Sequence, residues 1–122
     1  MYKIGQMSKK VNLSIKTLRY YDKFGILKPS YVDKYTGYRY YTDEDVLKCE
    51  YIKLLKSLDY TLKEINDNKD GLSNYSISKK QEEIKKRIDE LKIKYKLLNK
   101  IKKQMSGPSI FDNINVEGDN NE

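Results

Sequence analysis

A heptad pattern in the second half of the chain restricts the possible folds more than any other feature. From Ile84 onward, steps of four, three, four, three and seven residues separate the apolar positions Ile84, Ile88, Leu91, Tyr95, Leu98 and Met105. Such a stripe flanked by Lys, Glu and Arg is typical of a coiled coil. A helix over 77–105 would be roughly 40 Å long, too long to be buried in a chain of this size. We therefore expect it to pair with a second copy; the alternative is a hairpin with a later helix, for which the residues after Gly107 offer no candidate.

The N-terminal residues predict two short helices joined by a tight turn. Ile4, Met7 and Val11 share one helix face, and Asn12 tolerates the left-handed backbone that a tight break requires. Ser14 is a suitable N-cap for the next helix. On that helix Ile15 and Leu18 face inward, which leaves polar and aromatic side chains outside. This arrangement favours a helix-turn-helix whose second helix enters the DNA major groove, although the helices alone fit any two-helix corner.

A hairpin is expected after the second helix. Gly25 ends the helix, Pro29 prevents another, and strands are predicted at 30–32 and 38–41 around a turn over 33–37. An isolated two-stranded hairpin is only marginally stable. It must therefore lean on the helices as a wing. Seven of the twelve tyrosines fall between Ser14 and Tyr41, mixed with Arg and Lys, which suits a surface that grips phosphates.

Two further helices are predicted before the heptad segment. Thr42 caps a helix whose first turn is acidic, which suits the positive end of the helix dipole. Its expected apolar stripe consists of Leu47, Tyr51, Leu54, Leu55 and Leu58. Thr61 and Glu64 form a capping box for a short fourth helix from Leu62, followed by a polar connection over 66–76. Cys49, in the third helix, is interpreted as a small buried side chain rather than a sensor thiol.

Composition narrows the classes of function. The net charge is +7 and the pI about 9.3, which points to a polyanionic partner. With no His and one Cys, the commonest general base and a disulfide are both excluded, and no glycine-rich phosphate loop is present. We therefore expect no enzyme, no cofactor and no metal. No apolar run is long enough to span a bilayer, so a cytoplasmic protein without membrane contact is expected.

The two most specific runs, IGQMSKKVNLSIKTLRYYDKFGILKP at 4–29 and TGYRYYTDEDV at 36–46, resemble the MerR family of transcription regulators. The hairpin sequence is most similar to the multidrug-responsive BmrR and TipA branch. The resemblance implies a mainly α fold, a winged helix-turn-helix with a two-stranded hairpin wing and a long dimerisation helix that forms an antiparallel coiled coil. It further implies a homodimer that binds a pseudo-palindromic promoter in double-stranded DNA, distorts it and works with RNA polymerase.

The resemblance also assigns roles to residues. The expected DNA-binding residues are Lys16, Thr17, Arg19, Tyr20 and Tyr21 on the recognition helix, Tyr38, Arg39 and Tyr40 on the wing, and Lys56 and Tyr60 at a second wing. Tyr21 has packing beneath the recognition helix as its alternative, and Tyr41 is either a core or a wing residue. The expected dimerisation residues are Ile84, Ile88, Leu91, Tyr95, Leu98 and Met105.

The expected organisation is a DNA-binding domain over 1–76, a coiled-coil helix over 77–105 and a partly disordered acidic tail over 106–122. Drug-sensing relatives carry a large effector domain where this sequence has sixteen residues, so it is either a fragment or a short regulator. The inducing signal, the operator and the sign of regulation stay open. An architectural DNA-bending protein such as a recombination directionality factor is the alternative function, and a coiled-coil adaptor is a third.

Overall fold

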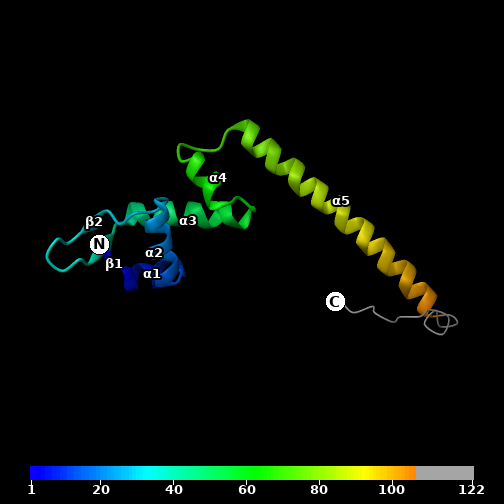
Figure 1. Ribbon diagram of the computed structural model, residues 1–122, viewed down its shortest axis with the longest axis horizontal. Helices are drawn as coiled ribbons and strands as arrows, with labels where there is room; N and C mark the ends of the chain where they lie inside the picture. Colours follow the sequence, from blue (N-terminus) through cyan, green and yellow to red (C-terminus); the bar gives the residue numbers. More distant parts are fainter. Residues whose placement is uncertain (107–122) are drawn as a thin grey trace. The chain divides into compact units, whose positions relative to one another are not determined.

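The computed structural model describes residues 1–106, in which short N-terminal elements precede one long helix (Figure 1). The elements are β1 (Tyr2–Lys3), α1 (Ile4–Val11), α2 (Ile15–Phe24), β2 (Tyr31–Val32), β3 (Arg39–Tyr41), α3 (Asp43–Ser57), α4 (Leu62–Asp67) and α5 (Asn74–Met105). The chain divides into two units, Met1–Ser76 and a second that begins at Ile77. Nearly all of the predicted acidic tail lies outside the described residues.

The predicted helix-turn-helix is confirmed. Asn12 adopts the left-handed conformation, with φ of 56°, between α1 and α2. The Ser14 side chain then accepts a hydrogen bond from the Thr17 backbone N–H at 3.0 Å and so caps α2. Met7, Val11 and Leu18 are fully buried. The two helices therefore pack on each other through Met7, Val11 and Leu18 as predicted, whereas Ile15, also expected to face inward, is 37% exposed at the first turn of α2.

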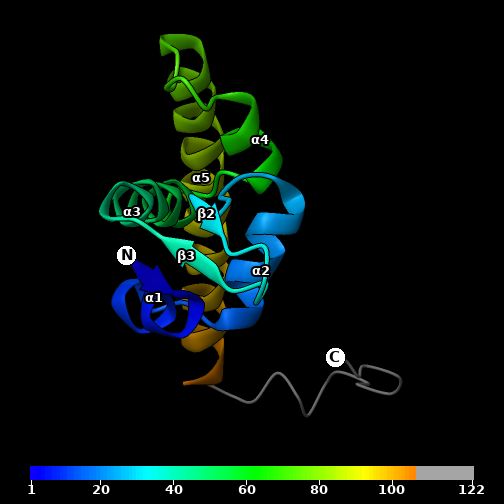
Figure 2. The ribbon, with the colours of Figure 1, turned by 90° about the vertical axis from the view of Figure 1, so that its left-hand side faces the viewer.

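The wing contains one strand more than the sequence predicts. β3 pairs antiparallel with β2 and also with β1, so the sheet has three strands in the order β1-β3-β2 (Figure 2). Tyr2 lies opposite Tyr41, and Lys3 opposite Tyr40. A two-residue strand carries no alternation that a sequence pattern would reveal. Its pairing ties the wing to the start of α1.

The hairpin turn is closed by side-chain and backbone geometry together. Asp33 Oδ1 accepts hydrogen bonds from the backbone N–H groups of Tyr35 at 2.8 Å and Thr36 at 3.0 Å. These two bonds hold the pKa of Asp33 below its ordinary value because they stabilise the charged carboxylate. The bond from Thr36 has the larger effect. Gly37 has a φ of 73°, which glycine adopts at no steric cost. The turn therefore sets the direction in which β3 returns.

The apolar stripe predicted for α3 is not the face of the helix that packs on the core. Of the expected stripe only Leu55 is buried, while four residues are exposed on the other side: Leu47, Tyr51, Leu54 and Leu58. The buried face carries Asp45, Cys49, Ile52 and Leu55. Asp45 is tolerated there because its Oδ2 accepts bonds from the Ser30 hydroxyl at 2.6 Å and the Thr42 backbone N–H at 2.9 Å. A hydrogen-bonded acid thus takes a position that an apolar pattern would assign to solvent.

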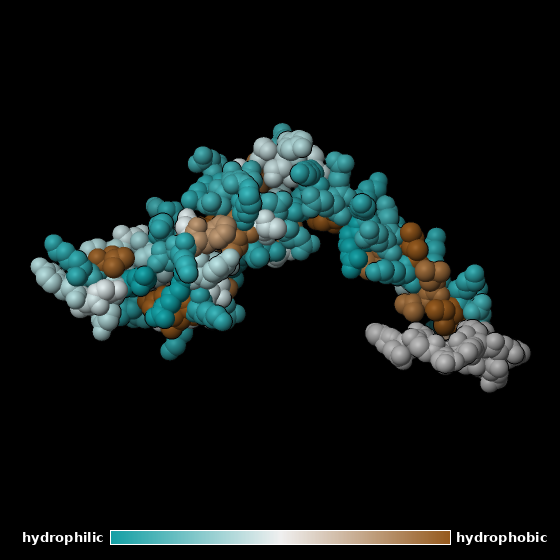
Figure 3. All heavy atoms as spheres, viewed as in Figure 1, coloured by the Kyte–Doolittle hydropathy of each residue, from teal (hydrophilic) through white to brown (hydrophobic). Residues whose placement is uncertain are grey.

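The last two helices follow the sequence closely. α4 has the predicted capping box, in which Thr61 and Glu64 bond each other's backbone N–H groups. α5 begins at Asn74, three residues before the predicted start, with Ser73 Oγ accepting from the Ser76 backbone N–H at 3.0 Å. With 32 residues, α5 is about 48 Å long. Its heptad residues are all exposed, and apolar side chains gather toward its C-terminal end (Figure 3).

Candidate nucleic-acid interface

A hollow of about 570 Å³ lies where β1, α1, α2 and the wing meet. Four cationic side chains line it: Lys3, Lys9, Arg19 and Arg39. The first turn of α1, Gly37 and Tyr38 complete the lining, which contains no carboxylate. Cations around a concave surface, next to the backbone N–H groups of a helix start, favour an anionic ligand.

The side chains of α2 that were predicted to contact DNA differ in their exposure to solvent. Lys16, Arg19 and Tyr20 project from the helix into solvent, and Tyr20 is 52% exposed. Thr17 is half-buried, and its hydroxyl lies 2.9 Å from Ser14 Oγ. The exposed face of α2 therefore presents two cations and an aromatic ring, while Thr17 also serves the cap.

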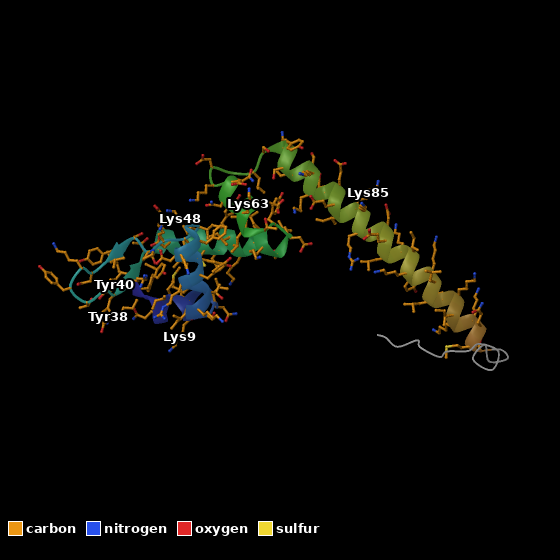
Figure 4. All side chains as sticks on the ribbon, in the orientation of Figure 1. Lys9, Tyr38, Tyr40, Lys48, Lys63 and Lys85 are labelled. Carbon is orange, nitrogen blue, oxygen red and sulfur yellow. The ribbon has the colours of Figure 1, made fainter. Side chains whose placement is uncertain are left out.

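The wing presents aromatic rings beside these cations. Tyr38 is 53% exposed, and Lys3 Nζ lies 4.8 Å from its ring centroid. The Tyr40 ring is half-buried against Tyr31, at 5.8 Å between centroids. Lys9, Tyr38 and Tyr40 lie along one edge of the Met1–Ser76 unit, and Lys48 and Lys63 lie along the opposite edge (Figure 4). The wing tyrosines thus share an edge with α1.

Arg39 has a partner within the protein. Its Nε donates to Asp22 Oδ2 on α2 at 2.8 Å, and the two side chains are 43% and 17% exposed. A guanidinium has five N–H donors, so this bond leaves others for a phosphate. Arg39 therefore both fixes the wing on the recognition helix and adds positive charge to the hollow.

Two of the expected DNA-binding residues need correction. Tyr21 and Tyr60 are only 6% and 4% exposed. Burial, with a smaller contribution from Cys49, raises the pKa of Tyr21. The Tyr60 hydroxyl donates to the Ser76 carbonyl at 3.3 Å, at the start of α5. Both rings are part of the core, since each is far too enclosed to lie against a duplex; of the alternatives for Tyr21, packing beneath the helix is the one observed.

The structure also gives the exposure of the other residues that the sequence analysis singled out. Lys56 is exposed near the end of α3, and Tyr41 is fully buried beneath the wing. Cys49 is buried as expected, and burial, followed by the nearby Glu50, raises its pKa to about 11. A thiol with that pKa is protonated and unreactive at neutral pH. Among residues 1–106 no group of His, Cys, Asp or Glu has a metal-binding arrangement, and no helix could span a membrane.

Sequence reasoning missed Lys3, Gln6 and Lys9, which join the hollow from β1 and α1. Lys9 stands on a helix that was assigned only a packing role. The spacing of Lys9 from the apolar positions Ile4, Met7 and Val11 does place it on the outer face of α1, whereas Lys3 lies in β1, just before that helix. Only the pairing of β1 with β3, however, brings that face beside the wing.

A three-stranded wing packed on a helix-turn-helix, with cations and tyrosines along one edge, defines a DNA-binding module of the winged helix-turn-helix class. Residues 2–72 match the model of the MerR HTH family regulatory proteins. The chain belongs to the MerR family.

Relatives and solved structures agree with this assignment. The multidrug-efflux transporter 1 regulator of Bacillus subtilis (strain 168) is 39% identical over 107 residues, which cover 85% of this chain and 38% of that protein. The HTH-type transcriptional regulator YyaN of the same strain is 30% identical over 115 residues, 83% of each chain. The sequence thus spans about two fifths of the first relative and most of the second.

Two structures solved with DNA are also similar. The EcmrR–DNA complex has a TM-score of 0.79 at 33% identity and covers 86% of this chain and 40% of that one. HiNmlR, described as a MerR family regulator lacking the sensor domain and bound to promoter DNA, has a TM-score of 0.59 at 27% identity and covers 91% and 98%.

Proposed function

We propose that this chain is a sequence-specific DNA-binding transcription regulator that acts as a homodimer on a pseudo-palindromic promoter. The single observation that carries the proposal is the hollow lined by Lys3, Lys9, Arg19 and Arg39 beside an exposed recognition helix. Cations that converge on one edge from four separate elements suit a phosphate backbone that crosses that edge. Relatives of similar fold that are bound to DNA support the same reading.

The two kinds of contact have separate tasks. Arg19 and Lys16 project from α2, the helix that enters the major groove in this class, and there an Arg reads guanine with two hydrogen bonds. Lys3, Lys9, Tyr38 and Arg39 meet phosphates and fix the register of the protein on the duplex. Specificity then comes from α2, and most of the salt-dependent affinity from β1, α1 and the wing.

The homodimer follows from the exposed stripe of α5. Ile84, Ile88, Leu91 and Tyr95 are between 38% and 67% exposed, although apolar rings and branched chains favour burial. A second α5 in antiparallel orientation covers this stripe with an identical one. Two recognition helices at a fixed separation then read two half-sites. Control of transcription through DNA distortion, and contact with RNA polymerase, extend the proposal by family membership.

Footprinting on DNA upstream of the encoding gene tests the function. We expect one protected pseudo-palindrome whose centre becomes hypersensitive to cleavage, because bending distorts the base steps there. Equal protection of unrelated sequences would point instead to an architectural DNA-bending protein. A lack of salt-dependent DNA binding would contradict both and leave a coiled-coil adaptor.

A further inference from the structure

A second hollow lies on the Met1–Ser76 unit, away from the cationic edge. It measures about 440 Å³, within the range of roughly 300–1,000 Å³ that is typical of small-molecule sites. Its walls are the segment after α2, α3, α4 and Lys69. Lys48, which lines it, lies on the edge opposite Lys9 and the wing tyrosines (Figure 4). This hollow, named here the α3–α4 pocket, is therefore separate from the proposed DNA surface.

The α3–α4 pocket has an apolar interior. Leu27, Ile52 and Ile65 belong to the core of the unit and close the bottom of the hollow. Ile26 is half-buried and Tyr51 is 41% exposed, so both offer apolar surface that the fold itself leaves uncovered. Burial of that surface is favourable, and the interior therefore suits the apolar part of a ligand.

Three lysines surround this interior: Lys28, Lys48 and Lys69. Lys48 lies 3.4 Å from Glu44 in an ion pair that is well exposed on both sides and so contributes little. Lys69 donates to the Gly25 carbonyl at 3.2 Å, and its ammonium group has two further donors. Both lysines therefore remain available to a ligand.

The one acid that lines the pocket does not neutralise these lysines. Asp45 is 2% exposed, and its Oδ2 already accepts bonds from the Ser30 hydroxyl at 2.6 Å and the Thr42 N–H at 2.9 Å. Three ammonium groups against one carboxylate leave a net positive charge. The rim of the pocket therefore favours an anion.

The kind of anion follows from the donors around the pocket. Phosphate groups are commonly held by free backbone N–H groups or by the planar fork of an arginine. Here the N–H groups of Gly25, Ile26 and Leu27 all donate to the Tyr21 carbonyl, at 3.0, 3.0 and 3.3 Å. None of the described residues that line the pocket is an arginine. Lysine ammonium groups alone favour a singly charged carboxylate over a phosphate ester.

The α3–α4 pocket also adjoins the end of the recognition helix. Gly25 is the C-cap of α2, with φ of 92°, and the residues that follow it in the pocket wall lead to β2 of the wing. Lys69 bonds the carbonyl of this same glycine. A ligand that draws the Lys69 ammonium toward itself thus acts on the junction between the recognition helix and the wing.

We propose that the α3–α4 pocket binds a small molecule that joins an aromatic apolar body to a carboxylate, and that its binding lowers the affinity of the protein for DNA. The apolar body covers Ile26 and Tyr51, and the carboxylate pairs with Lys48 and Lys69. DNA affinity falls because Lys69 is withdrawn from the Gly25 carbonyl and negative charge is added to the unit. The binding site is independent of the proposed function, whereas its effect on DNA affinity rests on that function.

Titration of the ¹⁵N-labelled full chain with 1-naphthylacetate, followed through amide chemical shifts, tests the site. We expect saturable shifts at Ile26, Ile52 and Ile65, with Gly5 and Lys9 on the opposite edge unaffected. The amide 1-naphthylacetamide keeps the ring without the charge and should bind about tenfold more weakly, since each of two lysine pairs contributes a factor of about three. The cation 1-naphthylmethylammonium should cause no shift at the pocket.

Charge removal on the protein gives the matching test. Lys48→Gln/Lys69→Gln should weaken 1-naphthylacetate binding about tenfold by the same arithmetic and leave 1-naphthylacetamide unchanged. Both lysines are exposed, so the variant should keep the amide spectrum of the folded protein. Lys63→Gln/Lys79→Gln removes as many charges outside the pocket and should alter the binding of neither probe.

Several outcomes would overturn the inference. These are equal binding of the acid and its amide, shifts on both edges alike, and shifts centred on the exposed stripe of α5. Shifts at Ile52 and Ile65 on dilution of the chain without a probe would assign the pocket to a second copy and overturn it too.

Fluorescence anisotropy with the protected promoter fragment tests the effect on DNA. We expect saturating 1-naphthylacetate to lower the affinity at least about fivefold, the lower end of typical coupling between two sites, and to have no effect on Lys48→Gln/Lys69→Gln. An unchanged affinity in a chain that shows the pocket shifts would overturn the coupling to DNA. A chain that shows the shifts but binds no DNA contradicts the proposed function and supports the binding site.

Discussion

At the scale of single residues, exposure separates side chains that are available to contact DNA from side chains that build the fold. Arg19 and Tyr20 are exposed, whereas the adjacent Tyr21 is a core residue. Neighbouring tyrosines on one helix thus have different tasks because a single step turns the side chain by about 100° around the axis. The same separation holds on the wing, where Tyr38 is exposed and Tyr41 is fully buried.

Changing Arg19 to Ala tests base readout. We expect the affinity for the protected promoter fragment to fall by roughly 1–3 kcal/mol, and discrimination at one base pair to relax, because the two bonds to guanine are lost. Fluorescence anisotropy at fixed salt measures both quantities. Lys63→Ala on the opposite edge removes the same charge and should leave affinity nearly unchanged; an equal loss in both variants would mean that Arg19 contributes charge only.

Lys9→Ala should behave differently from Arg19→Ala. A phosphate contact carries no sequence information, so we expect binding to all duplexes to weaken alike. The slope of log affinity against log salt should become shallower by about one unit. Anisotropy titrations at several salt concentrations measure the slope. An unchanged slope would remove Lys9 from the interface.

Tyr41 makes the free energy of unfolding depend on pH in the alkaline range. Burial, followed by the charge of Asp22, raises its pKa to about 12 from 10.0. The unfolded chain therefore releases the phenolic proton first, and stability present below pH 10 is lost as the pH rises toward 12. We expect Tyr41→Phe to reduce this loss, as measured by urea unfolding from pH 8 to pH 11.5.

At neutral pH the Tyr41→Phe variant should be almost as stable as the unsubstituted protein. Among residues 1–106 the buried Tyr41 hydroxyl has no hydrogen-bond partner, so its removal should change the free energy of unfolding by no more than about 1 kcal/mol in either direction. A loss of several kcal/mol at pH 7 would reveal a partner for this hydroxyl.

At the scale of elements, the wing is held in place by three devices of different kinds. Backbone pairing joins β3 to β1, the Asp33 turn closes the hairpin, and the Asp22–Arg39 bond fixes β3 on α2. Partly exposed ion pairs contribute about 0–1 kcal/mol, so the last device matters more for the direction of the wing than for stability.

Asp22→Asn separates these two effects. Removal of a carboxylate from a cationic surface should by itself strengthen binding to a polyanion. We nevertheless expect affinity to fall by a factor of about two to five, because Arg39 loses the partner that orients the wing, and a pair of about 1 kcal/mol corresponds to such a factor. Tighter binding by Asp22→Asn would show that orientation by Asp22 is unimportant. Thermal unfolding serves as the control and should shift little.

At the scale of the whole molecule, the proposed unit of function is two copies. The 32-residue α5 has no described partner that covers its heptad stripe, whereas the Met1–Ser76 unit has its own buried core. Burial of Ile84, Ile88 and Leu91 against identical residues would remove this exposed surface from water. In the proposed homodimer, dimerisation and DNA binding are therefore expected to be coupled, since one unit alone reads only one half-site.

Leu91→Lys tests that coupling. We expect the dimer to dissociate at micromolar concentration, because two ammonium groups would be buried in the seam, and promoter binding should disappear with it. Sedimentation velocity measures the association. Ile93→Lys places the same charge on the other face of α5 and should leave the dimer intact. A Leu91→Lys protein that still sediments as a dimer would contradict the coiled coil.

The sequence alone determined the elements that depend on local physics. Asn12, Ser14 and Gly25 delimit α2 through backbone conformation and capping, and the Thr61–Glu64 box begins α4. The period of the α5 stripe is likewise a property of neighbouring residues. The fold class and the family assignment followed from such local signals, because each is completed within a few residues.

Only the tertiary structure decided which faces of the helices and strands pack against one another. It assigned Tyr21 and Tyr60 to the core, turned the apolar stripe of α3 outward and placed Asp45 inside. It also brought Lys3 and Lys9 to the wing through a two-residue strand. The physical reason is that burial and pairing depend on residues some 40 positions away, and the energies of those contacts outweigh the polarity of any single position.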